Sequence, residues 1–225
     1  MIPWTHLDTA HIPNDGGELT FSHRGDEFSI KLTGKRGELM NSRVYNSEKV
    51  LSQLGCAHIK PHYDAQILVG GLGMGYTLAA ALKAVNADSQ VTVAELIPEV
   101  VQWNNGPLGN CAGNPLQDPR TKIHIGDVKE LLTSRQPTFD AILLDVDNGP
   151  KGLTHTDNNW LYSVDGLKDI YDTLHPNGML AIWSAGPDYL FTLRLKEIGF
   201  RVDTRIVQAS PKKGSRHTIF LARKL

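Results

Sequence analysis

Residues 66–76 read QILVGGLGMGY, and this stretch restricts the possible folds more than any other part of the chain. It begins with an apolar run that lacks polar alternation, which is typical of a strand buried on both faces of a sheet. Four glycines follow within six positions, where the backbone can take positive φ angles and approach a ligand closely. The stretch therefore predicts a buried strand, a ligand-binding turn and a helix, as at the strand ends of open α/β sheets.

The rest of the chain beyond this stretch continues the alternation of helices and strands. Helices are predicted at 76–85, 98–105, 128–135, 162–174 and 187–200, and strands at 90–96, 121–127, 139–147 and 179–185. Strands that alternate with helices indicate a parallel sheet covered by helices on both faces. Two final strands flank the turn at 211–215, and this hairpin predicts an antiparallel strand inserted at one edge.

The first part of the chain has a different pattern. Residues 18–32 predict two strands around an Arg-Gly-Asp turn. Residues 46–55 predict a short helix that ends at Gly55. We therefore divide the chain into an N-terminal β-hairpin extension with a short helix, residues 1–60, and an α/β domain, residues 61–225.

Composition excludes several classes of protein. The chain has 225 residues and a formal net charge of -1, which does not favour nucleic acid or a membrane surface. Its start lacks the pattern of a signal peptide, and no apolar run approaches the ~18 residues of a membrane span. Two cysteines, Cys56 and Cys111, occur without a CxxC motif and make a metal site unexpected. We expect a cytoplasmic protein that binds neither nucleic acid, membrane nor metal.

The spacing of the glycines separates several kinds of ligand. Gly71, Gly73 and Gly75 form the pattern G-x-G-x-G, and Tyr76 stands where the dinucleotide fingerprint G-x-G-x-x-G requires its third glycine. The phosphate-binding P-loop is also excluded, because no Gly-Lys-Ser/Thr follows. A glycine-rich turn can also serve close packing alone, so the glycines by themselves leave both interpretations open.

Two carboxylates extend the pattern to the next strand ends. Glu95 ends the second strand of the α/β domain, where an acid can accept hydrogen bonds from both hydroxyls of a ribose. Asp127 ends the third strand. Either carboxylate could instead only cap the helix that follows, and for Asp127 this is a strong alternative.

The G-x-G-x-G turn with these acids resembles the class I S-adenosylmethionine-dependent methyltransferases. The resemblance implies a Rossmann-like fold with a mostly parallel seven-stranded sheet and a C-terminal β-hairpin. It also implies binding of S-adenosylmethionine or its decarboxylated form. The cofactor-binding residues implied in this way are Gly71, Gly73, Gly75, Glu95, Asp127 and Val128, with the last two at the adenine.

The fourth strand end narrows the resemblance to the spermidine synthase branch of this superfamily, which includes the polyamine aminopropyltransferases. The segment DAILLDVDNGP places Asp145 and Asp147 where the transferred group would lie. Further counterparts of that branch are Pro150, Leu161, Tyr162 and the turn at 174–178. The small N-terminal β-extension is similar as well.

This chain departs from the branch in its substrate half. The second aspartate of the motif falls on Asn148, or on Asp147 if a gap is allowed, and Gly149 is inserted before the proline. Residues 40–48 occupy the place of the family's polyamine-contacting Gln and Asp-Glu-x-x-Tyr cluster without matching it. The resemblance is therefore closer at the positions that bind the cofactor than at those that bind the substrate.

The expected chemistry is transfer of a methyl or aminopropyl group to a small acceptor that carries an amine. Asp145, helped by Tyr45 or Tyr162, could orient the amine and accept its proton. Asp145 and Asp147 could instead only form the turn, and His155 is a weaker candidate base. A catalytically inactive or regulatory protein of the same fold stays open, as does a homodimer, whereas the glycine spacing disfavours a nicotinamide-dependent oxidoreductase.

Overall fold

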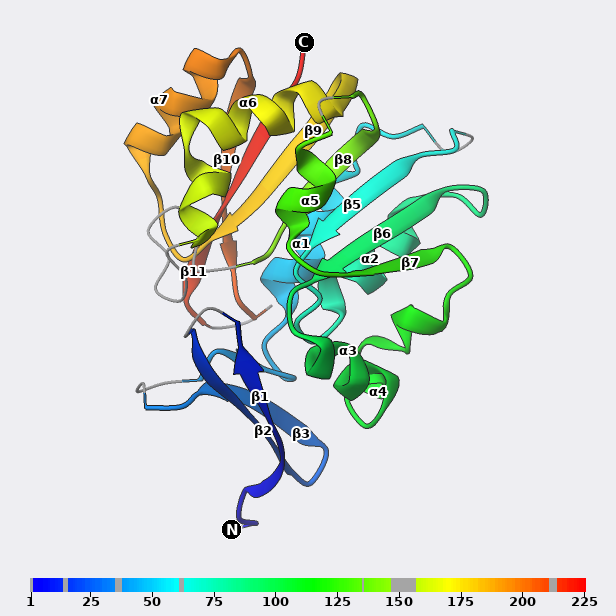
Figure 1. Cartoon of the computed structure of the whole chain (residues 1–225), viewed down its shortest axis with the longest axis vertical. Helices are drawn as coiled ribbons and strands as arrows, with labels where there is room; N and C mark the ends of the chain where they lie inside the picture. The colour runs from blue at the N-terminus through cyan, green and yellow to red at the C-terminus, as the bar shows by residue number, and fades with distance from the viewer. Residues whose placement is uncertain are drawn as a thin grey trace.

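The computed structural model describes residues 2–13, 16–34, 38–60, 63–134, 136–146, 157–210 and 214–225. The strands in this part of the chain form two sheets, a smaller antiparallel one near the N-terminus and a larger one that follows it (Figure 1). Asp147, Asn148, Gly149, Pro150 and His155 lie outside the described residues.

The smaller sheet has four strands in the order β1-β2-β3-β4. Its strands are β1 (Thr5–Ile12), β2 (Gly17–Arg24), β3 (Glu27–Leu32) and β4 (Met40–Asn41). The predicted hairpin is confirmed, because β2 and β3 pair up to Arg24 and Glu27 across the turn. Phe21 stacks on Trp103 with ring centroids 4.7 Å apart, and this contact joins the small sheet to the helical layer of the large one.

The larger sheet has seven strands in the order β10-β11-β9-β8-β5-β6-β7. Its strands are β5 (Gln66–Gly70), β6 (Gln90–Glu95), β7 (Thr121–Ile125), β8 (Phe139–Leu144), β9 (Leu174–Ser184), β10 (Arg201–Gln208) and β11 (Arg216–Arg223). Strands β5 to β9 pair in parallel, and β11 lies antiparallel between β9 and β10. The predicted fold class is confirmed, and the strand order reverses between β5 and β8, where ligands bind in such sheets.

Helices cover both faces of the large sheet (Figure 1). They are α1 (Asn46–Gly55), α2 (Tyr76–Ala84), α3 (Pro98–Asn105), α4 (Gly109–Ala112), α5 (Val128–Leu132), α6 (Val164–Thr173) and α7 (Tyr189–Ile198), with 3₁₀ turns at Pro115–Gln117 and Asp157–Tyr162. Ile67 and Val69 pack toward α1, α2 and α3, and Leu68 between them packs toward α5, α6 and α7. None of the helices in the described ranges is both long and apolar enough to cross a membrane.

Helix α1 packs on β8 and β9 of the large sheet, although it comes before the predicted start of the α/β domain. A Cβ atom at Gly55 would overlap the Leu143 side chain and lie 3.1 Å from Ala181 Cβ. The helix does end at Gly55, and the residue after it keeps a right-handed backbone. Gly55 therefore serves the close approach of α1 to the sheet, not the left-handed helix end that its position suggested.

Candidate active site

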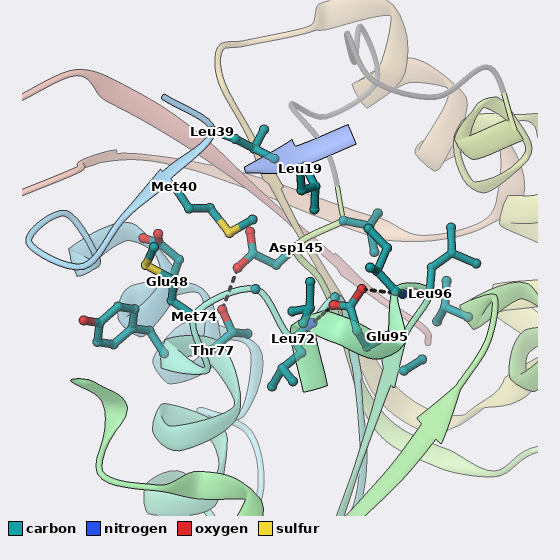
Figure 2. A pocket seen from close by; sticks show the side chains of 18 of the residues that line it. Leu19, Leu39, Met40, Glu48, Leu72, Met74, Thr77, Glu95, Leu96 and Asp145 are labelled. Atoms are coloured by element: carbon teal, nitrogen blue, oxygen red, sulfur yellow. Dashed lines mark hydrogen bonds between the residues drawn. The ribbon is translucent and has the colours of Figure 1, made fainter. Parts of the chain in front are cut away.

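A pocket of about 250 Å³ opens at the carboxyl ends of β5, β6, β7 and β8 (Figure 2). Its floor contains Gly71 and Gly73 from the turn after β5, together with Glu95, Asp127 and Asp145 from the following strand ends. The small sheet closes it from the other side. Strand ends that are far apart in sequence therefore meet in one cavity, as the order of motifs predicted.

The glycine turn has left-handed backbone angles at all three predicted positions. The φ angles are +87° at Gly71, +50° at Gly73 and +80° at Gly75. A Cβ atom at Gly71 would lie 2.5 Å from the Asp145 carbonyl oxygen, and one at Gly73 would lie 2.9 Å from Met40 Sδ. The turn therefore requires glycine, and Gly71 and Gly73 line the pocket.

Gly75, unlike Gly71 and Gly73, is not among the described residues that line the pocket. It precedes the first residue of α2 and faces Asn104 and Pro115, outside the pocket lining that the structure describes. The Asn104 side chain donates a hydrogen bond of 2.8 Å to the Gly73 carbonyl. Helix α3 thus holds the glycine turn from behind.

Glu95 is the most deeply buried carboxylate of the pocket, with 8% of its surface exposed. One oxygen accepts a hydrogen bond from the Leu72 N–H at 3.0 Å, and the other accepts one from the Ile97 N–H at 3.0 Å. Burial raises the pKa of Glu95, while these backbone N–H groups lower it. Glu95 fixes the glycine turn and lines the pocket, and its contact with a ribose stays a prediction.

Asp127 both caps the following helix and lines the pocket. Its side chain accepts a hydrogen bond of 2.9 Å from the Lys129 N–H and so caps α5. The same residue lines the pocket together with its neighbours Gly126 and Val128. Capping α5 does not remove Asp127 from the site, and its contact with adenine stays a prediction.

Asp145 directly follows β8 and lies beside the glycine turn. Its N–H donates to the Gly70 carbonyl at 2.9 Å, and its carboxylate accepts a hydrogen bond of 2.7 Å from the Thr77 hydroxyl. Burial raises the pKa of Asp145 to about 6, and the Thr77 hydrogen bond opposes this rise. The carboxylate is thus oriented by α2 and shifted toward neutral pH.

Glu48 in α1 is the site residue that the sequence reading missed. It lines the same pocket as Asp145, and Figure 2 shows both side chains at the end near Met40. Burial and the nearby Asp145 charge raise the pKa of Glu48 to about 7, whereas a 2.7 Å hydrogen bond from Ser47 lowers it. The only sequence signal was that residues 40–48 stand in place of the family's substrate-contacting cluster.

The two phenols proposed to assist Asp145 have other partners. Tyr45 stacks on Tyr76 with ring centroids 4.6 Å apart, and neither Tyr45 nor Tyr162 belongs to the described pocket lining. Tyr162 is buried in the core beneath α7, edge to face with Phe191. An assisting role of either tyrosine therefore has no support from the described pocket lining.

The charges of the pocket have one sign. Its lining contains four carboxylates, Glu48, Glu95, Asp127 and Asp145, and among the described lining residues there is no lysine, arginine or histidine. Opposite charges attract strongly in a partly buried site, because the effective dielectric constant is low. The pocket therefore suits a cationic ligand.

Taken together, the fold and the pocket define a Rossmann-like α/β protein with a pocket at the switch point of a methyltransferase-type sheet. The family model described as "Spermine/spermidine synthase domain" matches residues 47–191, more than half of the chain. The chain belongs to the spermine/spermidine synthase domain family, which confirms the resemblance found in its motifs.

Sequence relatives carry names from the same family. The chain is 30% identical over 152 residues to the polyamine aminopropyltransferase of Thermococcus onnurineus, covering 66% of this chain and 49% of that protein. It is 26% identical over 123 residues to the polyamine aminopropyltransferase of Sulfolobus acidocaldarius, covering 55% and 39% respectively. The chain thus spans about half the length, or less, of these curated relatives.

Solved structures agree on the fold. The spermidine synthase from Thermotoga maritima superposes with a TM-score of 0.75 at 17% identity, covering 98% of this chain and 72% of that one. A spermidine synthase in complex with the transition state analogue AdoDATO gives a TM-score of 0.73 at 18% identity, with the same coverage. At this identity the likeness establishes the shared fold.

Proposed function

We propose that the chain is a transferase that moves an aminopropyl group from decarboxylated S-adenosylmethionine to an amine. The observation that carries this proposal is that every charged residue of the described pocket lining is a carboxylate. The decarboxylated donor has a sulfonium and an ammonium and no acid group. S-adenosylmethionine adds a carboxylate, which would meet four others without a cation among the described lining residues. The names of the relatives support the same class of reaction.

The residues around the glycine turn fit the nucleoside part of such a donor. Gly71 and Gly73 offer backbone without a Cβ atom, and Glu95 offers a carboxylate at the cavity. Asp127 and the Val128 backbone lie at the next strand end, where an adenine edge would be held. The bound donor would supply a carbon next to a positive sulfur: the amine nitrogen would form a bond to this carbon, the carbon–sulfur bond would break, and neutral methylthioadenosine would leave.

Asp145 and Glu48 supply the acid–base chemistry in this proposal. An ammonium acceptor must lose one proton before its nitrogen has a lone pair for attack. Burial brings the pKa of Asp145 to about 6 and that of Glu48 to about 7, so the pair can accept a proton near neutral pH. Because Thr77 orients the carboxylate, Asp145 is the residue that we assign to this proton transfer.

Calorimetry and turnover on the same preparation test the proposal. Decarboxylated S-adenosylmethionine should bind at least ~10-fold more tightly than S-adenosylmethionine, with methylthioadenosine between them. The Asp145→Asn variant should lower turnover of an amine acceptor by about 10²-fold, while methylthioadenosine affinity stays within about twofold.

Two results would contradict this assignment. Tighter binding of S-adenosylmethionine would point to methyl transfer in place of aminopropyl transfer. Binding of the donor without turnover of any amine by the unsubstituted protein would favour the catalytically inactive alternative.

A further inference from the structure

Two hydrogen bonds connect the pocket residue Glu48 to a histidine behind the pocket. The Ser47 hydroxyl donates to Oε2 of Glu48 at 2.7 Å, and the same Ser47 oxygen lies 3.1 Å from Nδ1 of His217. Ser47 and Glu48 begin α1, whereas His217 belongs to β11 and stands 170 residues away from Ser47. The fold of the whole chain is therefore needed to bring these three side chains together.

His217 is packed directly behind the pocket lining. Trp183 lines the pocket and meets the His217 ring edge to face, with ring centroids 4.5 Å apart. Burial lowers the pKa of His217, so its ring is neutral at neutral pH and carries one proton. Ser47 is only 1% exposed, and a buried hydroxyl of this kind depends on protein partners for its hydrogen bonds.

The number of available protons sets the direction of both hydrogen bonds. Serine has one hydroxyl proton, and an ionised carboxylate can only accept a hydrogen bond. When Glu48 is ionised, the Ser47 proton therefore points to Glu48, and the Ser47 oxygen accepts from His217. The neutral His217 ring must then carry its proton on Nδ1, whereas a histidine in water mostly carries it on Nε2.

The start of α1 is fastened to the sheet by separate contacts. The Asn46 side chain donates a hydrogen bond of 2.8 Å to the Gln208 carbonyl at the end of β10. The Asn46 N–H donates to the Ala209 carbonyl at 3.1 Å. The contribution of His217 that Asn46 does not duplicate is to orient the Ser47 hydroxyl.

Opposing influences act on the charge of Glu48. Burial and the Asp145 charge raise the pKa of Glu48 to about 7, and the Ser47 hydrogen bond lowers it. Tyr76 also interacts with Glu48, but burial raises the pKa of this phenol and keeps it neutral. Without the Ser47 hydrogen bond, Glu48 would be protonated over a wider range of pH. A protonated carboxyl neither attracts an ammonium nor takes its proton.

We propose that His217 is a positioning residue of the active site, whose Nδ1–H holds the Ser47 hydroxyl on Glu48 and thereby keeps Glu48 ionised for the acceptor amine. This inference rests on the proposed aminopropyl transfer and adds a residue to the same site. Ser47 and His217 are not among the described residues that line the pocket, so both act through Glu48.

Nitrogen NMR of the ligand-free protein tests the hydrogen bonds without turnover. In protein labelled with ¹⁵N-histidine at pH 8.5, we expect His217 to carry its proton on Nδ1, and loss of the signal in His217→Phe assigns it. Ser47→Ala removes the acceptor, so the proton should move toward Nε2. A proton on Nε2 of His217 in the unsubstituted protein overturns the inference.

Turnover of decarboxylated S-adenosylmethionine with 1,4-diaminobutane tests the effect on Glu48. His217→Phe keeps a ring that can pack on Trp183 but has no nitrogen. The acidic limb of the kcat/KM profile, to which both pocket carboxyls contribute, should move to higher pH by about 0.5 unit in His217→Phe and about one unit in Ser47→Ala. At pH 9 the profiles should converge. The double variant should match Ser47→Ala alone, because His217 acts through Ser47.

Asn46→Ala is the matched control, because it loosens the same helix start without removing either hydrogen bond to Ser47. It should leave the acidic limb in place.

Other outcomes overturn the inference and leave the proposed aminopropyl transfer intact. These are an acidic limb that His217→Phe does not move, a loss of rate that is equal at every pH, shifts that add in the double variant, and an equal shift in Asn46→Ala. Absence of turnover by the unsubstituted protein rejects the proposed function, and the inference falls with it.

Discussion

Replacing Asp145 with asparagine should stabilise the ligand-free protein at pH 8, although it removes the group assigned to proton transfer. Burial raises the pKa of Asp145 from 3.8 to about 6, so the folded state resists ionisation of this carboxyl. A difference of about two pKa units corresponds to ~3 kcal/mol. Because Asp145 is only partly shielded from solvent, we expect a gain of about 2 kcal/mol. Asparagine keeps an oxygen that can accept the Thr77 hydrogen bond.

The sign of the effect follows from proton binding. Between pH 3.8 and about 6 the folded state holds a proton on Asp145 that the unfolded chain has lost. The free energy of unfolding therefore falls as pH rises through this window, and the loss is complete above about pH 7. The Asp145→Asn variant should lack this contribution to the decrease in the free energy of unfolding. Glu48 should leave a residual decrease in the variant, and this decrease should end at lower pH than in the unsubstituted protein, because the Asp145 charge that helps to raise the pKa of Glu48 is gone.

Urea unfolding followed by circular dichroism at pH 4, 6 and 8 measures the difference directly. The variant and the unsubstituted protein should have similar stability at pH 4 and diverge by pH 8. Asp26→Asn, in the exposed turn between β2 and β3, is the matched control for the removal of one carboxylate. An Asp145→Asn protein that is equally or less stable at pH 8 would refute the claim that burial of this charge opposes folding.

Three further substitutions test other contacts. Gly55→Ala should lower the free energy of unfolding by ~1–3 kcal/mol, because its Cβ atom overlaps Leu143, and urea titration measures this. Glu95→Ala should weaken methylthioadenosine binding by ~1–3 kcal/mol in calorimetry, and equal losses with the 2′- and 3′-deoxy analogues would contradict a ribose contact. Thr77→Val removes the donor that lowers the pKa of Asp145, so the acidic limb of the kcat/KM profile should move to higher pH. An unchanged profile would show that Asp145 does not control that limb.

The large sheet could be predicted because each of its strands is encoded locally. Apart from Gln66 and Asp140, residues 66–70 and 139–144 are apolar without alternation, and both segments are buried on two faces in the structure. The glycine turn marked the switch point in the same way. Strand β1 was missed because most of its residues face solvent, so its sequence lacks an alternating apolar pattern. The strand conformation of β1 is instead stabilised by its pairing with β2, a contact that the local sequence does not reveal.

The site was predictable to the extent that its residues lie at or just after the ends of strands. Glu95, Asp127 and Asp145 follow that rule, and all three line the pocket. Glu48 does not, since it stands in the first turn of a short helix, where an acid usually interacts with the helix dipole at the surface. Its position depends on how closely α1 approaches the sheet, and that approach depends on Gly55.

The carboxylate pair joins the stability of the fold to the selectivity of the pocket. Burial that shifts the pKa of Glu48 to about 7 and of Asp145 to about 6 also makes the empty site unfavourable when both groups are ionised. A cation bound between them stabilises the ionised forms, so part of the attraction for the ligand is relief of this repulsion. An anionic or neutral ligand offers no such relief. The same two residues that weaken the ligand-free fold at alkaline pH would therefore select for positive charge in the proposed ligand, and the apolar side chains of the small sheet that line the same pocket strengthen both effects by excluding water.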